Sequence, residues 1–381
     1  MDVFNPLVSI VIPVYNGSDY LKHAIDSALA QKYENCEVLV INDGSTDEGK
    51  TESIALAYGD KIRYFSKENG GVATALNFGV EKMQGEYFSW LSHDDVYLPN
   101  KISGQIKILA GLKDKQTVLF GGFQVIDENG EYQFELDPIG DKQYTQEQMS
   151  TPLFALFRVV VHGCSLLLHK NHFGRIGLFD KTLPTTQDYE FFFRLMRNQN
   201  VYFHSDLFLQ VRRHKNQGIR NLSVSQQEEE DKTWFDMFSA LTKQERIAIS
   251  ENEYRFYYEF FNTPHFQRTH MKNTREYLRA SLVKQVPMLD GNNDLLYFRE
   301  FSRFVSELSD EYERKAYGAY QDFMLYKSTV SGSSTGLKVR IARPMFHLLR
   351  RTAEVLRVKE RLKGTKLYRR LFVRGVIDKL Q

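Results

Sequence analysis

The sequence predicts an α/β fold: a mostly parallel sheet flanked by helices, followed by a helical C-terminal region. Four short runs that are rich in apolar residues read as strands of a buried sheet. These runs are "VSIVI" (8–12), "EVLVI" (37–41), "IRYF" (62–65) and "YFSWL" (87–91). Amphipathic segments lie between them, and strand–helix alternation at this spacing is typical of parallel sheets. Beyond about residue 225 the pattern is helical throughout.

Two of the intervening segments illustrate the helical pattern. "SDYLKHAIDSALAQ" (18–31) begins with Ser18 or Asp19 as the expected N-cap. Its predicted buried face consists of Leu21, Ala24, Ile25, Ala28 and Leu29. "GVATALNFGVEKM" (71–83) repeats the pattern after the third strand.

Composition restricts the class of protein. The 381 residues are 42% hydrophobic and 26% charged, which suits about two soluble domains. Cys36 and Cys164 are the only cysteines, too few for a disulfide framework or a zinc cage, so we expect buried free thiols and a reducing cytoplasm. The N-terminus lacks the cationic region of a secretory signal, and no apolar run approaches the roughly 18 residues of a membrane span.

Charge is segregated along the chain, although the net charge is only +2. Residues 338–381 carry 14 Lys and Arg against 3 Asp and Glu, a local charge of +11. We therefore expect an α/β domain over 1–222, a helical domain over 223–330, a flexible linker over 331–337 and a basic amphipathic tail over 338–381.

The tail suits an interfacial helix on an anionic membrane surface. A solvated helix, a partner-binding arm or RNA binding on charge alone are the alternatives, and the membrane is favoured over nucleic acid. The predicted location is the cytoplasm, peripheral on the inner face of the cell membrane.

Polar clusters follow three of the predicted strands. They are "VYN" (14–16), "NDGSTD" (42–47) and "SHDD" (92–95). The carboxyl ends of parallel strands meet at one edge, where ligands bind. Adjacent acids such as Asp94 and Asp95 repel each other, and a divalent cation would offset that cost. The structural alternative is that both acids cap a helix beginning near Pro99.

Three blocks carry a resemblance to a known family. They are "VSIVIPVYNGSDYLKHAIDSALAQKYENCEVLVINDGSTDEG", "ENGGVATALNFGVEKMQGEYFSWLSHDDVYLPNKI" and "IGLFDKTLPTTQDYEFFFRLMRN". In order and spacing they resemble the family-2 glycosyltransferases, inverting enzymes of the Rossmann-like GT-A fold that use nucleotide-sugar donors. The resemblance covers about residues 6–215.

The resemblance implies a donor site along the sheet edge. Asp43 would accept a hydrogen bond from the N3–H of a uracil or thymine ring, a task that suits a group that only accepts. Asp94 falls on the position that ligates Mg²⁺ or Mn²⁺, with Asp95 ranked behind it; Ser92 replaces the usual first acid and Leu76 the usual Arg. The other implied donor-binding residues are Pro13, Val14, Tyr15, Asn16, Asn69, Asn77, Ser92 and His93.

The resemblance also implies a general base. Asp188 in "TTQDYEFFFRL" matches the family's catalytic Asp, with Gln187 in place of the common Glu. The structural alternative makes Thr186 an N-cap and Asp188 a partner of the helix dipole. Glu190 is the nearest competitor and should point away. His214 is a candidate metal or phosphate ligand, with Arg212 and Arg213 as alternatives for neutralising phosphate charge. His93 and His162 have a structural interpretation.

The predicted function is transfer of a sugar from a UDP-sugar, in preference to a dTDP-sugar, to a hydroxyl of a lipid-linked or oligosaccharide acceptor in surface polysaccharide synthesis. A non-catalytic nucleotide-sugar-binding module with a degenerate site is the alternative. A sugar-nucleotide pyrophosphorylase is disfavoured, because "PVYNGSDY" is neither Gly-rich nor basic. Sugar, acceptor, linkage and oligomeric state are not encoded in these motifs.

Overall fold

A computed structural model describes residues 4–141, 143–215, 217 and 222–285. Residues 1–278 form one compact unit, and a second unit begins at Arg279. The predicted linker and basic tail lie outside the described residues.

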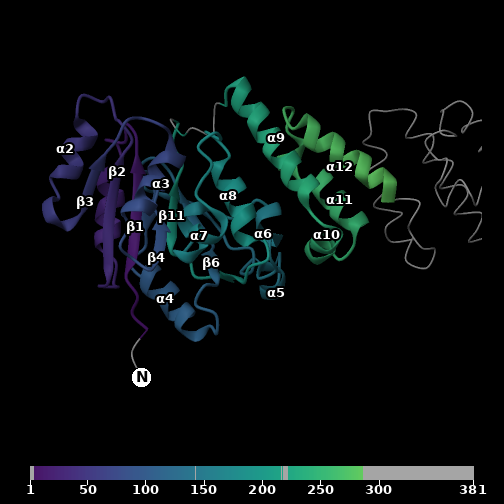
Figure 1. The fold of residues 1–381 in the computed structure, drawn as a ribbon, viewed down its shortest axis with the longest axis horizontal. Helices are drawn as coiled ribbons and strands as arrows, with labels where there is room; N and C mark the ends of the chain where they lie inside the picture. Colours follow the sequence, from purple (N-terminus) through teal and green to yellow (C-terminus); the bar gives the residue numbers. More distant parts are fainter. Residues whose placement is uncertain (1–3, 142, 216, 218–221, 286–381) are drawn as a thin grey trace, which may run out of the picture. The chain divides into compact units, whose positions relative to one another are not determined.

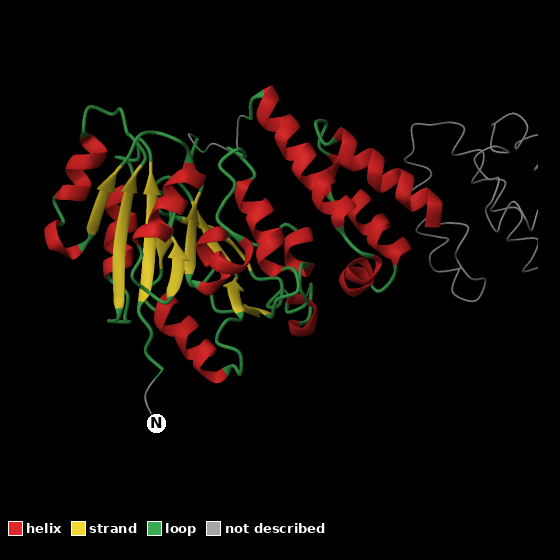
Figure 2. Ribbon diagram, in the orientation of Figure 1, coloured by secondary structure: helices red, strands yellow, loops and turns green. Residues whose placement is uncertain are grey.

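The first sheet has the strand order β3-β2-β1-β4-β9, and β3, β2, β1 and β4 run parallel (Figure 2). Its strands are β1 (Val8–Val14), β2 (Cys36–Asn42), β3 (Arg63–Ser66), β4 (Tyr87–Trp90) and the antiparallel β9 (Leu168–His169). Every residue of β1 is buried, so both faces of the sheet are covered there. The four predicted strands and the mostly parallel sheet are confirmed.

Pro13 sits near the end of a central strand, where proline is usually excluded. The pairing of β1 with β4 ends at Val11 and Trp90, and the Val11 carbonyl accepts from the Leu91 N–H on that side. Any other residue at position 13 would direct its N–H to this same side, one residue pair beyond the end of the ladder between β1 and β4. The missing donor therefore leaves no gap in the sheet.

The helices of the first half follow the predicted order. They are α1 (Leu21–Leu29), α2 (Lys50–Leu56), η1 (Gly59–Lys61), α3 (Val72–Lys82) and α4 (Lys101–Gly111). The predicted cap of the first helix is wrong: its N-cap is Tyr20, without a side-chain cap bond. Leu29 is also 37% exposed rather than buried, because α1 ends at that residue.

Two smaller sheets complete the α/β part. Parallel β10 and β6 form one, and the order β5-β11-β7-β8 forms the other. The strands are β5 (Val96–Tyr97), β6 (Val118–Gly121), β7 (Phe123–Ile126), β8 (Tyr132–Leu136), β10 (Val201–His204) and β11 (Leu209–Arg212). The helices here are α5 (Gln146–Met149), α6 (Phe154–Phe157), η2 (Gly163–Ser165), α7 (Asn171–Ile176) and α8 (Gln187–Met196).

The described C-terminal region is helical, as expected (Figure 1). It contains α9 (Val224–Ala240), α10 (Lys243–Ser250), α11 (Glu253–Phe261), η4 (Pro264–Gln267) and α12 (Lys272–Gln285). Its aromatic residues form a core with the α/β part, since Phe157 of α6 packs against Phe238 at 4.9 Å and Trp234 at 6.0 Å between ring centroids. Among the described residues, no helix combines the length and apolar character needed to cross a bilayer.

Lys101, the first residue of α4, is fully buried. Its ammonium donates to Ser89 Oγ at 2.7 Å and to the Leu166 carbonyl at 3.2 Å, and it lies 4.2 Å from the centre of the Tyr97 ring. Within the part of the chain that the structure describes, no carboxylate pairs with Lys101. Burial lowers the pKa of Lys101 to about 7.

This buried lysine predicts a pH-dependent stability. From about pH 7 upward, towards the ordinary lysine pKa, the unfolded chain binds more protons than the folded one, so the free energy of unfolding should rise by roughly 1 kcal/mol per pH unit. We expect Lys101→Met to remove this slope in denaturant unfolding measured between pH 7 and 8.5. Lys107→Met, at an exposed position of the same helix, is the control and should keep it. A slope that survives in Lys101→Met would contradict the prediction.

Candidate active site

The loops after β1 and β2 are joined at the carboxyl edge of the sheet. Asn16 has a positive φ of 48°, and its N–H donates to Ser45 Oγ at 2.9 Å. Its side-chain carbonyl accepts from the Thr46 N–H at 2.7 Å. Tyr15 beside it is 46% exposed, whereas Pro13 and Val14 are buried. An exposed ring therefore stands on a rigid double turn at this edge.

Asp43 follows β2 and is buried. Its carboxylate accepts from the Gly71 N–H at 2.7 Å and the Gly70 N–H at 3.2 Å, and it forms an ion pair with Lys67. A carboxylate has about four lone-pair directions, so most of its accepting capacity is used within the chain. Lys67 is a partner that the sequence analysis missed.

Gly44, directly after Asp43, allows the next loop to approach. Its φ of +70° favours glycine, and a Cβ there would lie 2.6 Å from the backbone nitrogen of Asn69. Asn69 itself is exposed at this edge. The predicted donor-binding residues 15, 16, 43 and 69 are thus gathered on adjoining loops.

The loop after β4 presents Ser92, His93 and Asp94 at the same edge. A Cβ on Gly17 would lie 2.4 Å from Cδ2 of His93, so the glycine permits contact between the β1 and β4 loops. Oδ2 of Asp94 lies 3.0 Å from Nε2 of His214, which follows β11. Both side chains retain some exposure, 15% and 10% respectively. Tyr20 packs on the His214 ring at 5.0 Å.

The Asp94 and His214 pair has the donor spacing of a metal site. Two neighbouring ligands at about 2.1 Å from an octahedral ion lie about 3.0 Å apart. One carboxylate oxygen and one imidazole nitrogen suit Mn²⁺, and substrate oxygens and water can fill the other positions. The residues present therefore fit a divalent ion at this point.

Asp95 points into the protein instead. Its Oδ1 accepts from the Arg212 N–H at 3.0 Å, and only 2% of the residue is exposed. Burial and the neighbouring charge of Asp94 raise the pKa of Asp95 well above its usual value. Asp94 and Asp95 thus occupy different environments, although they are adjacent in sequence.

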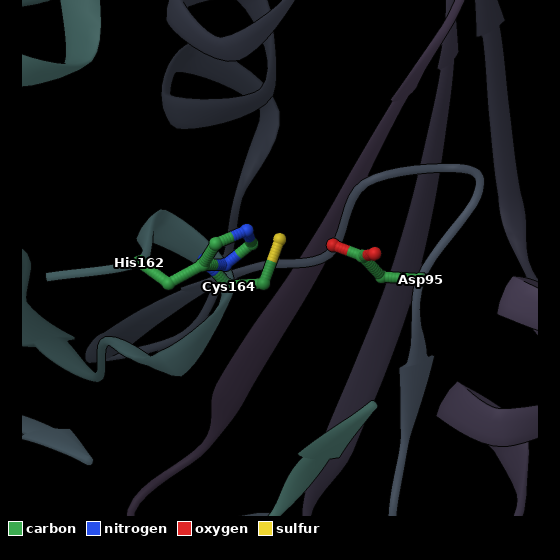
Figure 3. Close-up of side chains that lie close together, drawn as sticks. All are labelled: Asp95, His162 and Cys164. Carbon is green, nitrogen blue, oxygen red and sulfur yellow. The ribbon is translucent and has the colours of Figure 1, made fainter. Parts of the chain in front are cut away.

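Asp95, His162 and Cys164 form a compact cluster whose ligand atoms lie within 4.8 Å of one another (Figure 3). Figure 3 shows the sulfur of Cys164 between the His162 ring and the Asp95 carboxyl group. Burial raises the pKa of the Cys164 thiol, which also lies 3.2 Å from the Ser92 N–H. A protonated thiol is a poor partner for Mg²⁺ or Mn²⁺, which prefer oxygen ligands. The cluster braces the loop that carries Asp94.

Arg212 is not free to neutralise phosphate charge. Its guanidinium donates to the carbonyls of Asp94 and Asp127 at 3.0 and 3.1 Å and packs on the Tyr20 ring. The residue is only 3% exposed. It is a structural brace behind the Asp94 loop, and Arg213 packs against Phe134.

Asp188 lies in the first turn of α8 and is partly exposed. Burial raises the pKa of Asp188 to about 6. Hydrogen bonds from backbone N–H groups lower this pKa in part, and the charges of Glu229 and Glu230 add to the increase. Glu190 forms an ion pair with Arg194, as expected of a residue that points away. Ring contacts link α8 to the end of β4, since Phe179 stacks on Phe191 at 4.0 Å and meets Trp90 at 6.2 Å.

The structure bears differently on the two structural alternatives for the acidic residues. The N-cap of α4 is Asn100, so Asp94 and Asp95 do not cap that helix. Thr186 is the N-cap residue of α8 and Asp188 lies in its first turn, as the other alternative expects, but the Thr186 side chain makes no cap bond and its hydroxyl donates to Glu229. Asp188 is left with one described hydrogen bond, from the Tyr189 N–H.

Comparison with known proteins decides the family. A model described as Glycosyl transferase family 2 matches residues 9–197. An uncharacterized glycosyltransferase of Rickettsia typhi is 47% identical over 255 residues, which cover 67% of this chain and 79% of that protein. The chain belongs to glycosyl transferase family 2.

Other similar proteins are longer or more distant. The chain spans 37% of an uncharacterized glycosyltransferase of Rickettsia bellii, at 47% identity over 256 residues and 67% of this chain. It spans 46% of its relatives in Rickettsia felis and Rickettsia conorii. The structure of S. aureus TarS 1-349 with UDP-GlcNAc matches with a TM-score of 0.56 and 16% identity, over 74% of this chain and 83% of that one. This likeness shows the shared GT-A fold.

Three positions at which this family-2 chain departs from the family pattern have defined surroundings. Leu76 is fully buried, and Gln187 is buried with its Oε1 lacking a hydrogen-bond partner among the described residues. The Ser92 hydroxyl lies 3.2 Å from the Cys164 sulfur.

Asn77 was expected at the donor, but its amide exchanges two hydrogen bonds of 2.9 Å with the backbone of Phe179. Asn77 therefore fastens α3 to the segment before α8.

Proposed function

We propose that this glycosyltransferase is an inverting enzyme that moves a sugar from a UDP-sugar, in preference to a dTDP-sugar, to a hydroxyl of a lipid-linked or oligosaccharide acceptor in surface polysaccharide synthesis. The observation that carries the proposal is the Asp94 and His214 pair, 3.0 Å apart, at the edge where the loops after β1, β2 and β4 meet. Asp43, Tyr15 and Asn16 at that edge would hold the nucleoside. These contacts involve the nucleoside and the metal ion, so they do not select a particular sugar.

Two similar proteins support a donor of this class. The matched TarS structure contains UDP-GlcNAc. Chondroitin synthase of Pasteurella multocida is 43% identical over 112 residues, which are 29% of this chain and 11% of that protein. Both descriptions concern those proteins; for this chain they favour a nucleotide sugar and a glycan acceptor.

Asp94 and His214 would hold Mg²⁺ or Mn²⁺. When bound, the ion would neutralise charge that develops on the departing diphosphate, which stabilises the transition state more than the ground state. Asp95 stays behind the loop and would support it rather than coordinate. His93 and Ser92 would line the donor side of the same loop.

Asp188 would remove the proton from the acceptor hydroxyl. A carboxylate with a pKa of about 6 is a stronger base than an ordinary aspartate, yet it is still largely ionised at pH 7. Attack by the activated hydroxyl from the face opposite the leaving group inverts the anomeric centre in one displacement. Because the base must be ionised, turnover should fall as pH drops through about 6.

The alternative function is a nucleotide-sugar-binding module without catalysis. Ser92 and Gln187, which replace acids of the family pattern, favour this alternative. UDP release from a panel of UDP-sugars in the presence of Mn²⁺ separates the two: an enzyme releases UDP, and a dead module releases none. The raised pKa of Asp188 favours the enzyme, because a site that only binds has no need of a strong base.

The basic tail over residues 338–381 is the basis for the proposed location of the protein. Its charge of +11, together with the apolar residues mixed among the basic ones, favours an anionic membrane surface on the cytoplasmic side. Lipid-linked acceptors are presented at such a surface. Nucleic acid is not an expected partner.

Asp188→Asn tests the base. The amide cannot take the proton, so kcat for UDP-sugar turnover should fall by roughly 10²-fold or more while UDP binding by calorimetry is retained. Glu190→Gln is the matched control in the same helical turn and should keep most of the activity. Full turnover in Asp188→Asn would show that another residue is the base.

Asp94→Asn and His214→Ala test the metal ligands. In the presence of UDP, each should weaken Mn²⁺ binding by roughly 10-fold or more, measured from the EPR signal of free Mn²⁺. Asp19→Asn removes an exposed acid nearby and serves as the control. Equal Mn²⁺ affinity in Asp94→Asn and the unmodified chain would refute the assignment.

Deletion of residues 337–381 tests the location. Because each basic residue near an anionic surface contributes about 1 kcal/mol, the full chain should sediment with anionic vesicles and the truncated chain should stay in the supernatant. Vesicles of neutral lipid provide the control. If the deletion leaves the distribution unchanged, the tail serves another purpose.

A further inference from the structure

We propose that Glu229 of α9 is a positioning residue for the general base: it holds the turn that starts α8 and places a negative charge beside Asp188. This inference rests on the proposed function in assigning Asp188 as the base. It gives a role at the active site to a helix that lies beyond the segment matched to the family model, which ends at residue 197. The sequence pattern of this helix had indicated packing alone.

Three hydrogen bonds carry the positioning argument. A single oxygen of Glu229, Oε1, accepts from the Thr185 N–H at 2.9 Å, the Thr186 N–H at 2.8 Å and the Thr186 hydroxyl at 2.8 Å. Helix starts leave N–H groups without intrahelical partners, and a local side chain commonly accepts from them. Here the local candidate, Thr186, makes no cap bond. A side chain 43 residues away in sequence secures this turn instead.

The helix that carries Glu229 is itself firmly placed. Ser223 and Gln226 form a capping box at the start of α9. Glu230 accepts from Arg268 at 2.9 Å and lies 2.8 Å from His270, and Asp231 accepts from the Thr274 N–H at 2.8 Å. Three consecutive acids therefore make three different connections: to α8, to the segment after η4 and to α12. Thr233 of α9 adds a contact of 2.9 Å to the Thr186 hydroxyl.

The charges near Asp188 are unevenly compensated. Glu230 is paired with Arg268 and His270, and His265 lies 3.4 Å from it. Among the residues that the structure describes, no cation pairs with Glu229. Tyr189, on the same helix, is another titratable neighbour of Asp188, and burial and the charges of Asp188 and Glu230 raise the pKa of Tyr189 above the working range. Glu229 is thus the acid near Asp188 whose charge is not offset by an ion pair.

The two effects act in the same direction on catalysis. The hydrogen bonds fix the backbone from which Asp188 projects. The uncompensated charge disfavours ionisation of Asp188, which makes the carboxylate a stronger base once it is ionised. A neutral residue with the same acceptor oxygen would keep the first effect and lose the second.

A pH titration of Asp188 in the full chain tests the proposal without any substrate. The carboxyl carbon is followed by NMR in protein labelled with [γ-¹³C]aspartate, and Asp188→Asn identifies its resonance. Glu229→Gln keeps an oxygen that can accept all three bonds but removes the charge, so the midpoint should move to lower pH by roughly half a unit. Glu228→Gln removes an exposed charge one residue earlier on α9 and should leave the midpoint unchanged.

Glu229→Asp tests positioning separately. It keeps the charge but shortens the side chain, so the amides of Thr185 and Thr186 should exchange with solvent at least about tenfold faster. An unmoved midpoint in folded Glu229→Gln would overturn the electrostatic role, and unchanged exchange in Glu229→Asp would overturn the positioning role. If Glu229→Gln does not fold, amide exchange in Glu229→Asp still tests the positioning role. Neither readout depends on turnover, whereas the proposed function fails if Asp188→Asn remains active.

Discussion

The site depends on keeping two adjacent carboxylates apart at the end of β4. Both acids could be charged only at a high cost if both were buried, because they would repel each other in a poorly solvated place. The backbone resolves this by turning them in opposite directions. Asp95 goes inward, where the Arg212 N–H and Cys164 surround it and its pKa rises, and Asp94 goes outward to His214. The outward acid lies where a ligand can reach it.

The surroundings of this loop follow from that division. Arg212 donates its backbone N–H to Asp95 and its guanidinium to the Asp94 carbonyl, so one residue of β11 holds both halves of the acidic pair. Because β11 also pairs with β5, which begins directly after Asp95, the strand that leads to His214 is held in register with the loop that carries Asp94. The 3.0 Å spacing of Asp94 and His214 is therefore a consequence of sheet pairing rather than of a flexible contact.

The sequence was sufficient for features with a local period and insufficient for those set by distant contacts. Buried strands and the shared edge of their loops follow from apolar runs and from the geometry of parallel sheets. The predicted cap at Ser18 or Asp19 failed because Tyr20 takes that position, and the sequence offers no local signal for the turn geometry that decides it. Lys67 beside Asp43 and Phe179 beside Asn77 are 24 and 102 residues from their partners. Such pairings arise only when the elements pack.

Asp94, Asp95 and Asp188 show how one residue type acquires three characters from its environment. Asp95 is buried beside another acid, which favours its neutral form. The pKa of Asp188 is raised only to about 6, so Asp188 still ionises at neutral pH. The pKa of Asp188 depends partly on Glu229 and Glu230 of α9, which lie outside residues 9–197. A family-2 domain without acids at these positions of its C-terminal region would lack their contribution. The pKa of Asp188, the proposed base, is therefore a property of the whole compact unit and not of the matched segment alone.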